Sequence, residues 1–200
     1  TEDPQRPVDV TVTDEKGRLL AAWTTPLPIP KTEPPDPARF AERADEELSV
    51  EELYLKGRKL DRATDRLKAR QYYEKALARD ASHVLSLRAL AVLDFEAGLY
   101  TRAIERLRKA LERDSDEGLC WFYLGSSQLR LGSFAEALRC GYRATRCPGT
   151  VAIGFDLAGR AAMRLGGRRN AVEAFRSAVR ADGNDVAAVD HLMLSCDAAD

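Results

Sequence analysis

From residue 49 onward, small residues stand at fixed positions in a pattern that repeats every 34 residues. One position of the repeat holds glycine or alanine four times in a row, and two others hold alanine four times each: Gly57, Ala91, Gly125 and Gly159; Ala69, Ala103, Ala137 and Ala171; Ala76, Ala110, Ala144 and Ala178. A period of this length is typical of stacked helical hairpins, in which small residues let paired helices approach closely. The pattern therefore predicts an all-α solenoid over residues 49–200.

The repeat predicts four helix pairs and one covering helix. The pairs fill residues 49–82, 83–116, 117–150 and 151–184, and the covering helix fills 185–200. Within these units the expected helices are 50–62 and 65–79, 83–97 and 101–113, 118–131 and 134–147, 152–165 and 168–181, and 185–197.

Residues that start and stop helices stand at the predicted boundaries. Ser49 and Glu52 have the spacing of a capping box, in which the hydroxyl and the carboxylate each bind a backbone N–H of the other residue. We expect Thr101 and Ser133 to cap second helices of their pairs. Glycine tolerates the left-handed conformation that ends a helix, and it follows three first helices at 34-residue intervals: Gly98, Gly132 and Gly166.

The first 48 residues have a different pattern. Valines at 8, 10 and 12 alternate with polar residues, and a turn at 14–17 precedes a second apolar run, so residues 1–25 predict a β-hairpin arm. Six prolines fall between residues 26 and 37 and predict an extended linker. The linker region, 26–48, ends in a short helix expected over 38–47.

Charge and cysteine content narrow the possible partners. The net charge of −1 gives no reason to expect nucleic-acid binding, and no apolar run is long enough for a membrane span. Residues 1–48 carry 11 acidic against 6 basic side chains, so an acidic arm could fold back on the basic solenoid; ordinary surface variation is the alternative. The chain does not begin with Met and reads as a piece of a longer protein.

The cysteines predict buried packing residues rather than a zinc site. None forms a Cys-x-x-Cys pair, and the chain has two histidines. We expect four free, buried thiols, a reducing compartment and a cytoplasmic location: Cys120, Cys140, Cys147 and Cys196.

The repeat positions resemble the tetratricopeptide repeat family. The third repeat matches its pattern best, with Trp121, Leu124, Gly125, Gly132, Phe134, Ala137 and Ala144. It departs from the pattern at Gly141, where the family has an aromatic residue. The resemblance implies a right-handed superhelix of four helix pairs with a C-terminal capping helix, and a function in protein binding.

In this family the first helix of each pair lines a concave groove. Carried onto this sequence, the resemblance implies a groove that is apolar in the middle and charged at both ends, which suits a peptide or partner domain. The alternative is that several of these side chains pack against a neighbouring repeat. The implied groove residues are Tyr54, Arg58, Arg88, Val92, Phe95, Phe122, Ser126, Leu129, Asp156, Arg160 and Met163.

The residues with which chaperone-binding members clamp a terminal carboxylate are not matched. The corresponding positions hold Tyr54, Arg58, Ala89, Leu119 and Tyr123. We therefore do not expect a receptor for chaperone tails.

A second resemblance is narrower. Residues 52–57 and 73–80 are similar to the start of the helical tail in large bacterial proteins, where a mutarotase-like β-sandwich precedes tetratricopeptide repeats. It implies a helical accessory domain of a carbohydrate-active protein whose catalytic or sugar-binding domain is outside this chain. The Tyr-Arg-His run expected near Arg62 is missing.

Catalytic chemistry needs a convergent set of reactive groups, and no such set stands out. Neither His83 nor His191 has a ligand-type residue at i+4, and the spacing of Asp156 and Arg160 favours a helix-surface ion pair. We therefore expect no enzyme activity, no cofactor and no metal. The predicted function is a scaffold that binds a protein or peptide, with a homodimer possible through an exposed end of the solenoid.

Overall fold

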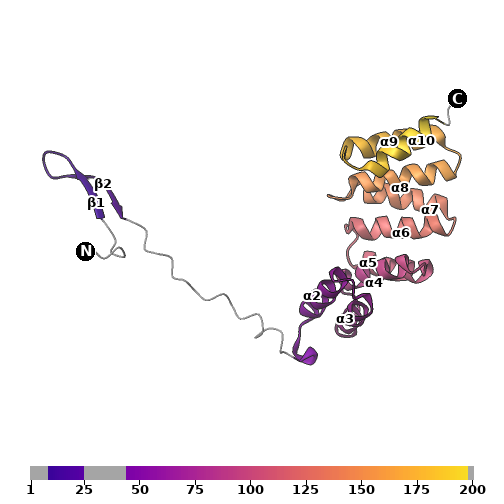
Figure 1. Ribbon diagram of the computed structural model, residues 1–200, viewed down its shortest axis with the longest axis horizontal. Helices are drawn as coiled ribbons and strands as arrows, with labels where there is room; N and C mark the ends of the chain where they lie inside the picture. The colour runs from indigo at the N-terminus through magenta and orange to yellow at the C-terminus, as the bar shows by residue number, and fades with distance from the viewer. Residues whose placement is uncertain (1–8, 25–43, 198–200) are drawn as a thin grey trace. The chain divides into compact units, whose positions relative to one another are not determined.

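The computed structural model describes residues 9–24 and 44–197, and the chain forms two units, residues 1–43 and 44–200 (Figure 1). In the first unit, β1 (Asp9–Thr13) and β2 (Leu19–Thr24) pair antiparallel, with Val10 opposite Trp23. The Asp14 carboxylate accepts hydrogen bonds from the backbone N–H groups of Lys16 and Arg18, at 2.9 and 2.8 Å, and so closes the turn. The predicted hairpin is confirmed, while the predicted Pro-rich linker lies outside the described residues.

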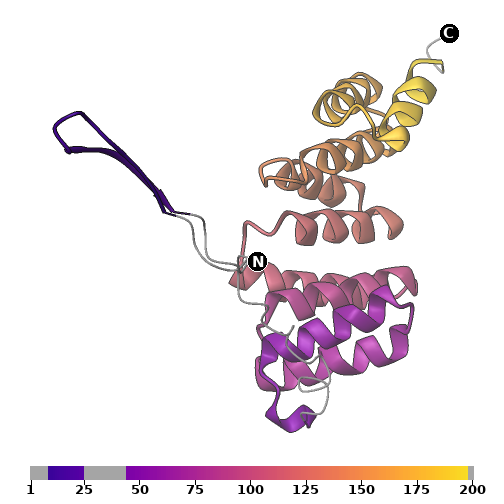
Figure 2. The ribbon, with the colours of Figure 1, turned by 60° about the vertical axis from the view of Figure 1, so that its left-hand side comes forward.

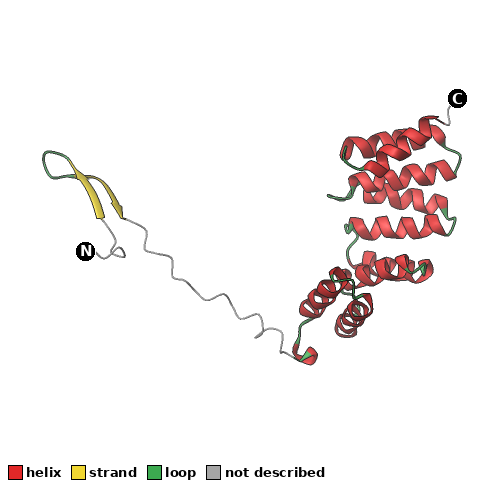
Figure 3. Cartoon of the chain, in the orientation of Figure 1, coloured by secondary structure: helices red, strands yellow, loops and turns green. Residues whose placement is uncertain are grey.

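The second unit is a stack of helices that follow one another antiparallel (Figures 1 and 3). Each helix predicted over residues 49–200 is present, and all but one agree with their predicted ends to within one residue. The helices are α2 (Val50–Arg62), α3 (Arg66–Arg79), α4 (Val84–Glu96), α5 (Tyr100–Arg113), α6 (Gly118–Arg130), α7 (Phe134–Ala144), α8 (Val151–Arg164), α9 (Arg168–Ala181) and α10 (Val186–Asp197).

The exception is α7, which ends at Ala144 rather than at 147. The Thr150 hydroxyl donates to the carbonyl oxygens of Ala144 and Cys147, at 2.8 and 3.1 Å, and Gly149 has a φ of 80°. These contacts satisfy the last carbonyl groups of α7 without another turn of helix, so the chain turns earlier than expected.

Helix starts follow the predicted signals only in part. The capping box is confirmed, because the Glu52 N–H donates to Ser49 Oγ at 3.2 Å and the Ser49 N–H donates to the Glu52 carboxylate at 2.7 Å. The predicted cap at Thr101 is wrong, because Thr101 lies inside α5. Ser133 takes the N-cap position of α7 as predicted, but its side chain makes no capping bond.

Backbone bonds close the turns within the pairs instead. Gly98, Gly132 and Gly166 have φ values of 76°, 80° and 77°, as predicted. The residue after each glycine donates to a carbonyl near the end of the first helix, as the Leu99 N–H does to Asp94 at 2.8 Å. In the first pair Thr64 takes the glycine position with a φ of 66°, although a β-branched residue is strained there.

Small residues allow the helices to cross closely. A Cβ added at Gly125 would lie 2.7 Å from Leu157 Cδ2 and 2.8 Å from Cys140 Cβ, and one added at Gly159 would lie 2.5 Å from the Phe175 ring. The predicted role of this glycine position is therefore confirmed. The same position on α10 holds Met193, which is 59% exposed.

Gly141 has a specific packing role that the repeat pattern did not reveal. It takes the aromatic position of the third repeat, and a Cβ there would lie 2.8 Å from the Ala158 nitrogen and 3.0 Å from the Gly154 carbonyl oxygen. The backbones of α7 and α8 therefore approach one another directly, in a space that an aromatic side chain would block.

Residues 44–48 pack on the first helix pair rather than continuing the arm. Of the helix expected over 38–47, residues 38–43 lie outside the described residues, and the described end forms one 3₁₀ turn, η1 (Asp45–Glu47). Asp45 accepts hydrogen bonds from Lys56 and Lys75 at 2.8 and 2.6 Å, and these lysines hold its pKa at about 2, below the usual 3.8. Asp45, counted among the acidic residues of the arm, thus neutralises basic side chains of the solenoid, and residues 1–43 carry 8 acidic against 6 basic groups.

Three cysteines are buried and free, as predicted. The prediction is wrong for Cys196, which is exposed on α10. Burial raises the pKa of Cys120 to about 12 and that of Cys140 to about 11, so both remain thiols at neutral pH.

Candidate functional site

The first helices lie on the inner side of the solenoid. From α4 onward each first helix contacts the first helix of the next pair, α4 with α6, α6 with α8 and α8 with α10, and the second helices α5, α7 and α9 each pack against the first helices before and after them. Figure 2 shows the stack from a second direction. Because the first helices meet, they form the more tightly curved side, which we call the inner face. All eleven predicted groove residues belong to these helices.

Three of the predicted residues are buried and offer little surface to a ligand. Tyr54 is 9% exposed and packs against the rings of Tyr73 and His83, with centroids 5.8 and 5.7 Å apart. Ser126 is 4% exposed, and in the described part of the chain its hydroxyl is the one buried side-chain polar atom without a hydrogen-bond partner. Asp156 is 6% exposed.

Ion pairs and aromatic contacts hold the middle of the inner face. Arg88 on α4 pairs with Glu117, which precedes α6, at 2.7 Å and so links two repeats. Phe95 contacts the ring of Tyr123 edge-on at 5.7 Å, and Phe122 contacts the same ring at 5.3 Å. Val92 on this stretch is half-buried, and Arg58 on α2 is exposed.

A hollow of about 320 Å³ lies at the C-terminal end of the inner face, and we call it the inner hollow. Three predicted groove residues meet there, Leu129 of α6 with Arg160 and Met163 of α8. The remaining lining comes from positions that were not predicted: Arg164, Phe175, His191, Leu194 and Ser195.

A buried carboxylate connects α8 with α10 beside the inner hollow. Asp156 lies 2.6 Å from Nδ1 of His191 and 3.3 Å from the Arg160 guanidinium. The predicted Asp156–Arg160 pair is thereby confirmed, but its carboxylate is buried rather than on the solvated surface of the helix. The search for a histidine partner at i+4 missed the contact of His191, since its partner lies 35 residues away on another helix.

The repeat register contained a signal for one of the missed residues. Leu194 stands 34 residues after Arg160, so it continues the series Arg58, Val92, Ser126 and Arg160 onto the covering helix. Extending the groove positions to α10 would have placed Leu194 in the site. His191 and Phe175 have no such signal, because they come from other positions of the repeat.

Nothing in the described residues assembles a metal centre, since no group of three or more His, Cys, Asp or Glu side chains converges in residues 9–24 and 44–197. Over the same residues, no helix combines the length and the apolar character needed to cross a bilayer.

Comparison with known proteins agrees with the repeat pattern. Residues 88–149 match the tetratricopeptide repeat family. The chain is 32% identical over 93 residues to tetratricopeptide repeat protein 7B of Homo sapiens, a match that covers 46% of this chain and 11% of that protein. The chain thus spans about a tenth of the length of this curated relative.

Solved structures share the architecture. A crystal structure of MamA protein superposes with a TM-score of 0.64 at 23% identity, over 73% of this chain and 80% of that one. The second repeat domain of human RPAP3, solved by NMR with an HSP70 peptide, superposes with a TM-score of 0.53 at 22% identity, over 56% of this chain and 93% of that one. The right-handed solenoid predicted from the sequence is therefore confirmed, and residues 88–149 within it match the tetratricopeptide repeat family.

Proposed function

We propose that this chain is a non-catalytic protein-interaction module whose inner face binds a peptide or an extended segment of a partner protein. The observation that carries the proposal is the inner hollow, where apolar side chains from α6, α8 and α10 converge beside basic groups. The fold itself is that of protein-interaction scaffolds, and related proteins of this family are generally not enzymes.

The lining of the inner hollow suits an apolar side chain next to a carboxylate. Leu129, Met163 and Leu194 provide apolar walls that an anchoring side chain can cover. Arg160 and Arg164 stand at the rim, and the Arg164 guanidinium lies 4.7 Å from the centre of the Phe134 ring. A guanidinium that lies over an aromatic ring still has N–H groups free at the edge of the ring. A ligand carboxylate can accept hydrogen bonds from these groups.

The rest of the inner face can extend the contact along a longer segment. The half-buried aromatic rings of Phe95, Phe122 and Tyr123 lie on α4 and α6, between the inner hollow and the exposed Arg58 on α2. An extended chain along these helices would meet apolar surface in the middle and cations toward both ends. The second repeat domain of human RPAP3, solved in complex with an HSP70 peptide, supports this proposal.

The comparisons describe helical repeats and give no support to the alternative, a helical accessory domain of a carbohydrate-active protein. The near-zero net charge favours a protein over a nucleic acid as partner. A second copy of the chain is a further possible partner, which sedimentation of the purified protein at several concentrations would reveal.

The two methionines of the chain offer a matched test, since Met163 lines the inner hollow and Met193 does not. Both are partly exposed, at 37% and 59%, so glutamate can be hydrated at either position without unfolding the helix. A partner is first named by affinity capture from native lysate with mass spectrometry, and its affinity is then measured by calorimetry. We expect Met163→Glu to weaken binding about tenfold or more, or about 1.4 kcal/mol, and Met193→Glu to leave it unchanged. Equal affinities for the two variants would place the binding site elsewhere.

A further inference from the structure

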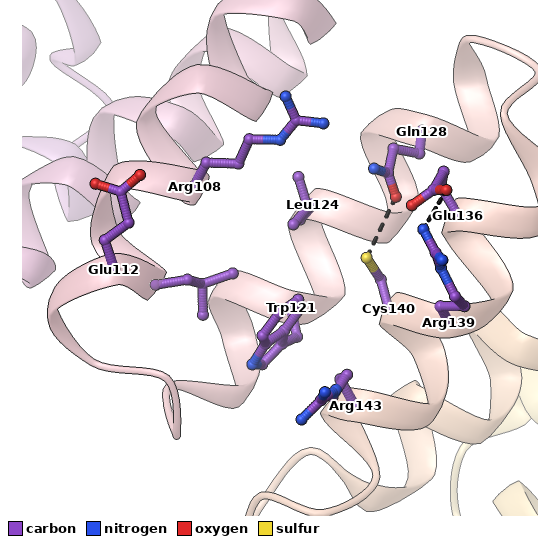
Figure 4. Close-up of a pocket in the computed structure, with 10 residues that line it drawn as sticks. Arg108, Glu112, Trp121, Leu124, Gln128, Glu136, Arg139, Cys140 and Arg143 are labelled. Atoms are coloured by element: carbon purple, nitrogen blue, oxygen red, sulfur yellow. Dashed lines mark hydrogen bonds and ion pairs between the residues drawn. The ribbon is translucent and has the colours of Figure 1, made fainter.

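A second hollow lies on the opposite side of the solenoid, between the second helices α5 and α7. It measures about 520 Å³, and we call it the outer hollow. Figure 4 shows Arg108 and Glu112 of α5 on one side, Arg139, Cys140 and Arg143 of α7 on the other, and Trp121, Leu124 and Gln128 of α6 between them. The hollow therefore has an apolar floor and charged walls.

The cations around the outer hollow outnumber the acids. Helix α5 and residues 134–146 together carry eight arginines and lysines against three glutamates. Arg139 pairs with Glu136, but within the described residues neither Arg108 nor Arg143 forms an ion pair with a carboxylate. The Arg143 guanidinium lies 5.7 Å from the centre of the Trp121 ring. A ligand that reaches the Trp121 floor would thus meet two unpaired cations.

In the first repeat, an acidic segment of this chain contacts the residues that correspond to Arg143 and Trp121. Two repeat periods separate Lys75 from Arg143 and Leu53 from Trp121. In the first repeat, Asp45 contacts Lys75 at 2.6 Å and Leu48 packs on Leu53. An acidic turn followed by an apolar side chain therefore fills this position of the repeat, with the carboxylate on the wall and the leucine on the floor.

A basic residue is kept at the wall position in three successive repeats, Lys75, Lys109 and Arg143, but the space beside it differs. In the second repeat Arg106 takes the position of Cys140, and its guanidinium binds the buried Asp94 at 2.9 Å. The hollow there is smaller, about 380 Å³. The first repeat has Tyr72 at this position, beside which η1 packs, and the third has the smaller Cys140, an open hollow and a cation without an ion pair.

We propose that the outer hollow binds an acidic segment of a partner protein in which carboxylates precede an apolar side chain, in the manner of residues 45–48. The carboxylates pair with Arg143 and Arg108, and the apolar side chain covers Trp121 and Leu124. Large aromatic residues in such hollows commonly provide much of the binding energy of an interface, and charge-assisted pairs fix its orientation. This surface is separate from the inner hollow, and the inference does not depend on the function proposed above.

A peptide of residues 44–50 is the probe, because it carries the three carboxylates and the leucine of the docked segment. The Trp23→Phe variant leaves Trp121 as the one tryptophan of the chain, and its indole N–H, which donates to the Ser115 carbonyl at 2.8 Å, gives a single NMR resonance. We expect the peptide to shift this resonance saturably, and a peptide with lysine in place of the acidic residues to leave it unmoved.

Two arginine variants separate a specific site from general charge attraction. Arg143→Glu should lower the peptide affinity about tenfold or more, whereas Arg180→Glu, the same change on α9, should leave it within about twofold. Arg108→Glu provides a second variant at the site, and the Met163→Glu change at the inner hollow should have no effect. All of these residues are exposed or partly exposed, and a circular dichroism spectrum checks each fold.

Three results would overturn the inference. The first is an indole resonance that does not move, or peptide shifts confined to α2 and α3, where the chain's own segment binds. The second is equal weakening by Arg143→Glu and Arg180→Glu. The third is an indole shift that grows with protein concentration in the absence of peptide, because a second copy would then be the occupant.

Discussion

Replacing Gly141 with alanine tests the close crossing of α7 and α8. The added Cβ would lie 2.8 Å from the Ala158 nitrogen, 3.0 Å from the Gly154 oxygen and 3.1 Å from the Ala158 Cα. All three are backbone atoms, so the helices must separate rather than a side chain rotate. Overpacking of this kind costs about 1–3 kcal/mol, and the better helix propensity of alanine returns about 0.5–1 kcal/mol. We expect a net loss of about 1–2 kcal/mol in the free energy of unfolding.

Urea unfolding followed by circular dichroism at 222 nm measures this loss. With a slope of about 2 kcal/mol per molar urea, the midpoint should fall by about 0.5–1 M. Gly183→Ala is the matched control, because a Cβ there meets only the Val179 carbonyl oxygen at 3.7 Å and its φ is not left-handed. That variant should be neutral or slightly more stable. A Gly141→Ala protein as stable as the wild type would refute the argument that backbone contact requires glycine at this crossing.

Three further predictions concern other parts of the solenoid. Thr64→Gly should raise the free energy of unfolding by about 0.5–1 kcal/mol, because it relieves a left-handed β-branched residue at the expense of chain entropy; urea midpoints measure it, and a lower midpoint would contradict the strain. Since the pKa of Asp45 falls from 3.8 to about 2 on folding, its ion pairs stabilise the protein above pH 4 and lose this effect as the pH falls from about 4 to 2. The pairs are partly solvated, so we expect about 1 kcal/mol, seen as a pH-dependent step in unfolding that Asp45→Asn abolishes. A thiol reagent at neutral pH should label Cys196 rapidly and the three buried cysteines only on unfolding, and peptide mass spectrometry measures the labelling. Rapid labelling of Cys140 would contradict its burial and show that the reagent reaches it through the outer hollow.

The helices could be predicted because each helix position, turn and close contact recurs in several repeats of the sequence. A single Gly125 could have many explanations, but glycine or alanine at the same position in four repeats has one, the close approach of a paired helix. The same redundancy fixed the helix ends. It failed where one repeat departs from the others, at Gly141 and at the early end of α7, because those features depend on one particular pair of neighbouring helices.

The site was harder to predict because it depends on contacts between repeats. The groove positions Leu129, Arg160 and Met163 do meet at one hollow, but His191 joins them through Asp156, a contact 35 residues apart that no local spacing reveals. Tyr54 illustrates the opposite error. A groove position in the first repeat becomes a core residue because Tyr73 and His83 close over it. Whether a repeat position faces a ligand is thus decided by its neighbours in the next repeat.

Met193 affects whether another repeat can pack after α10. At the corresponding position of earlier first helices, a glycine leaves a socket that the second helix of the pair fills, whereas on α10 the Met193 side chain occupies this position. A designed repeat grafted after α10 would therefore dock poorly, whereas Met193→Gly would reopen the socket and allow the array to be lengthened one module at a time.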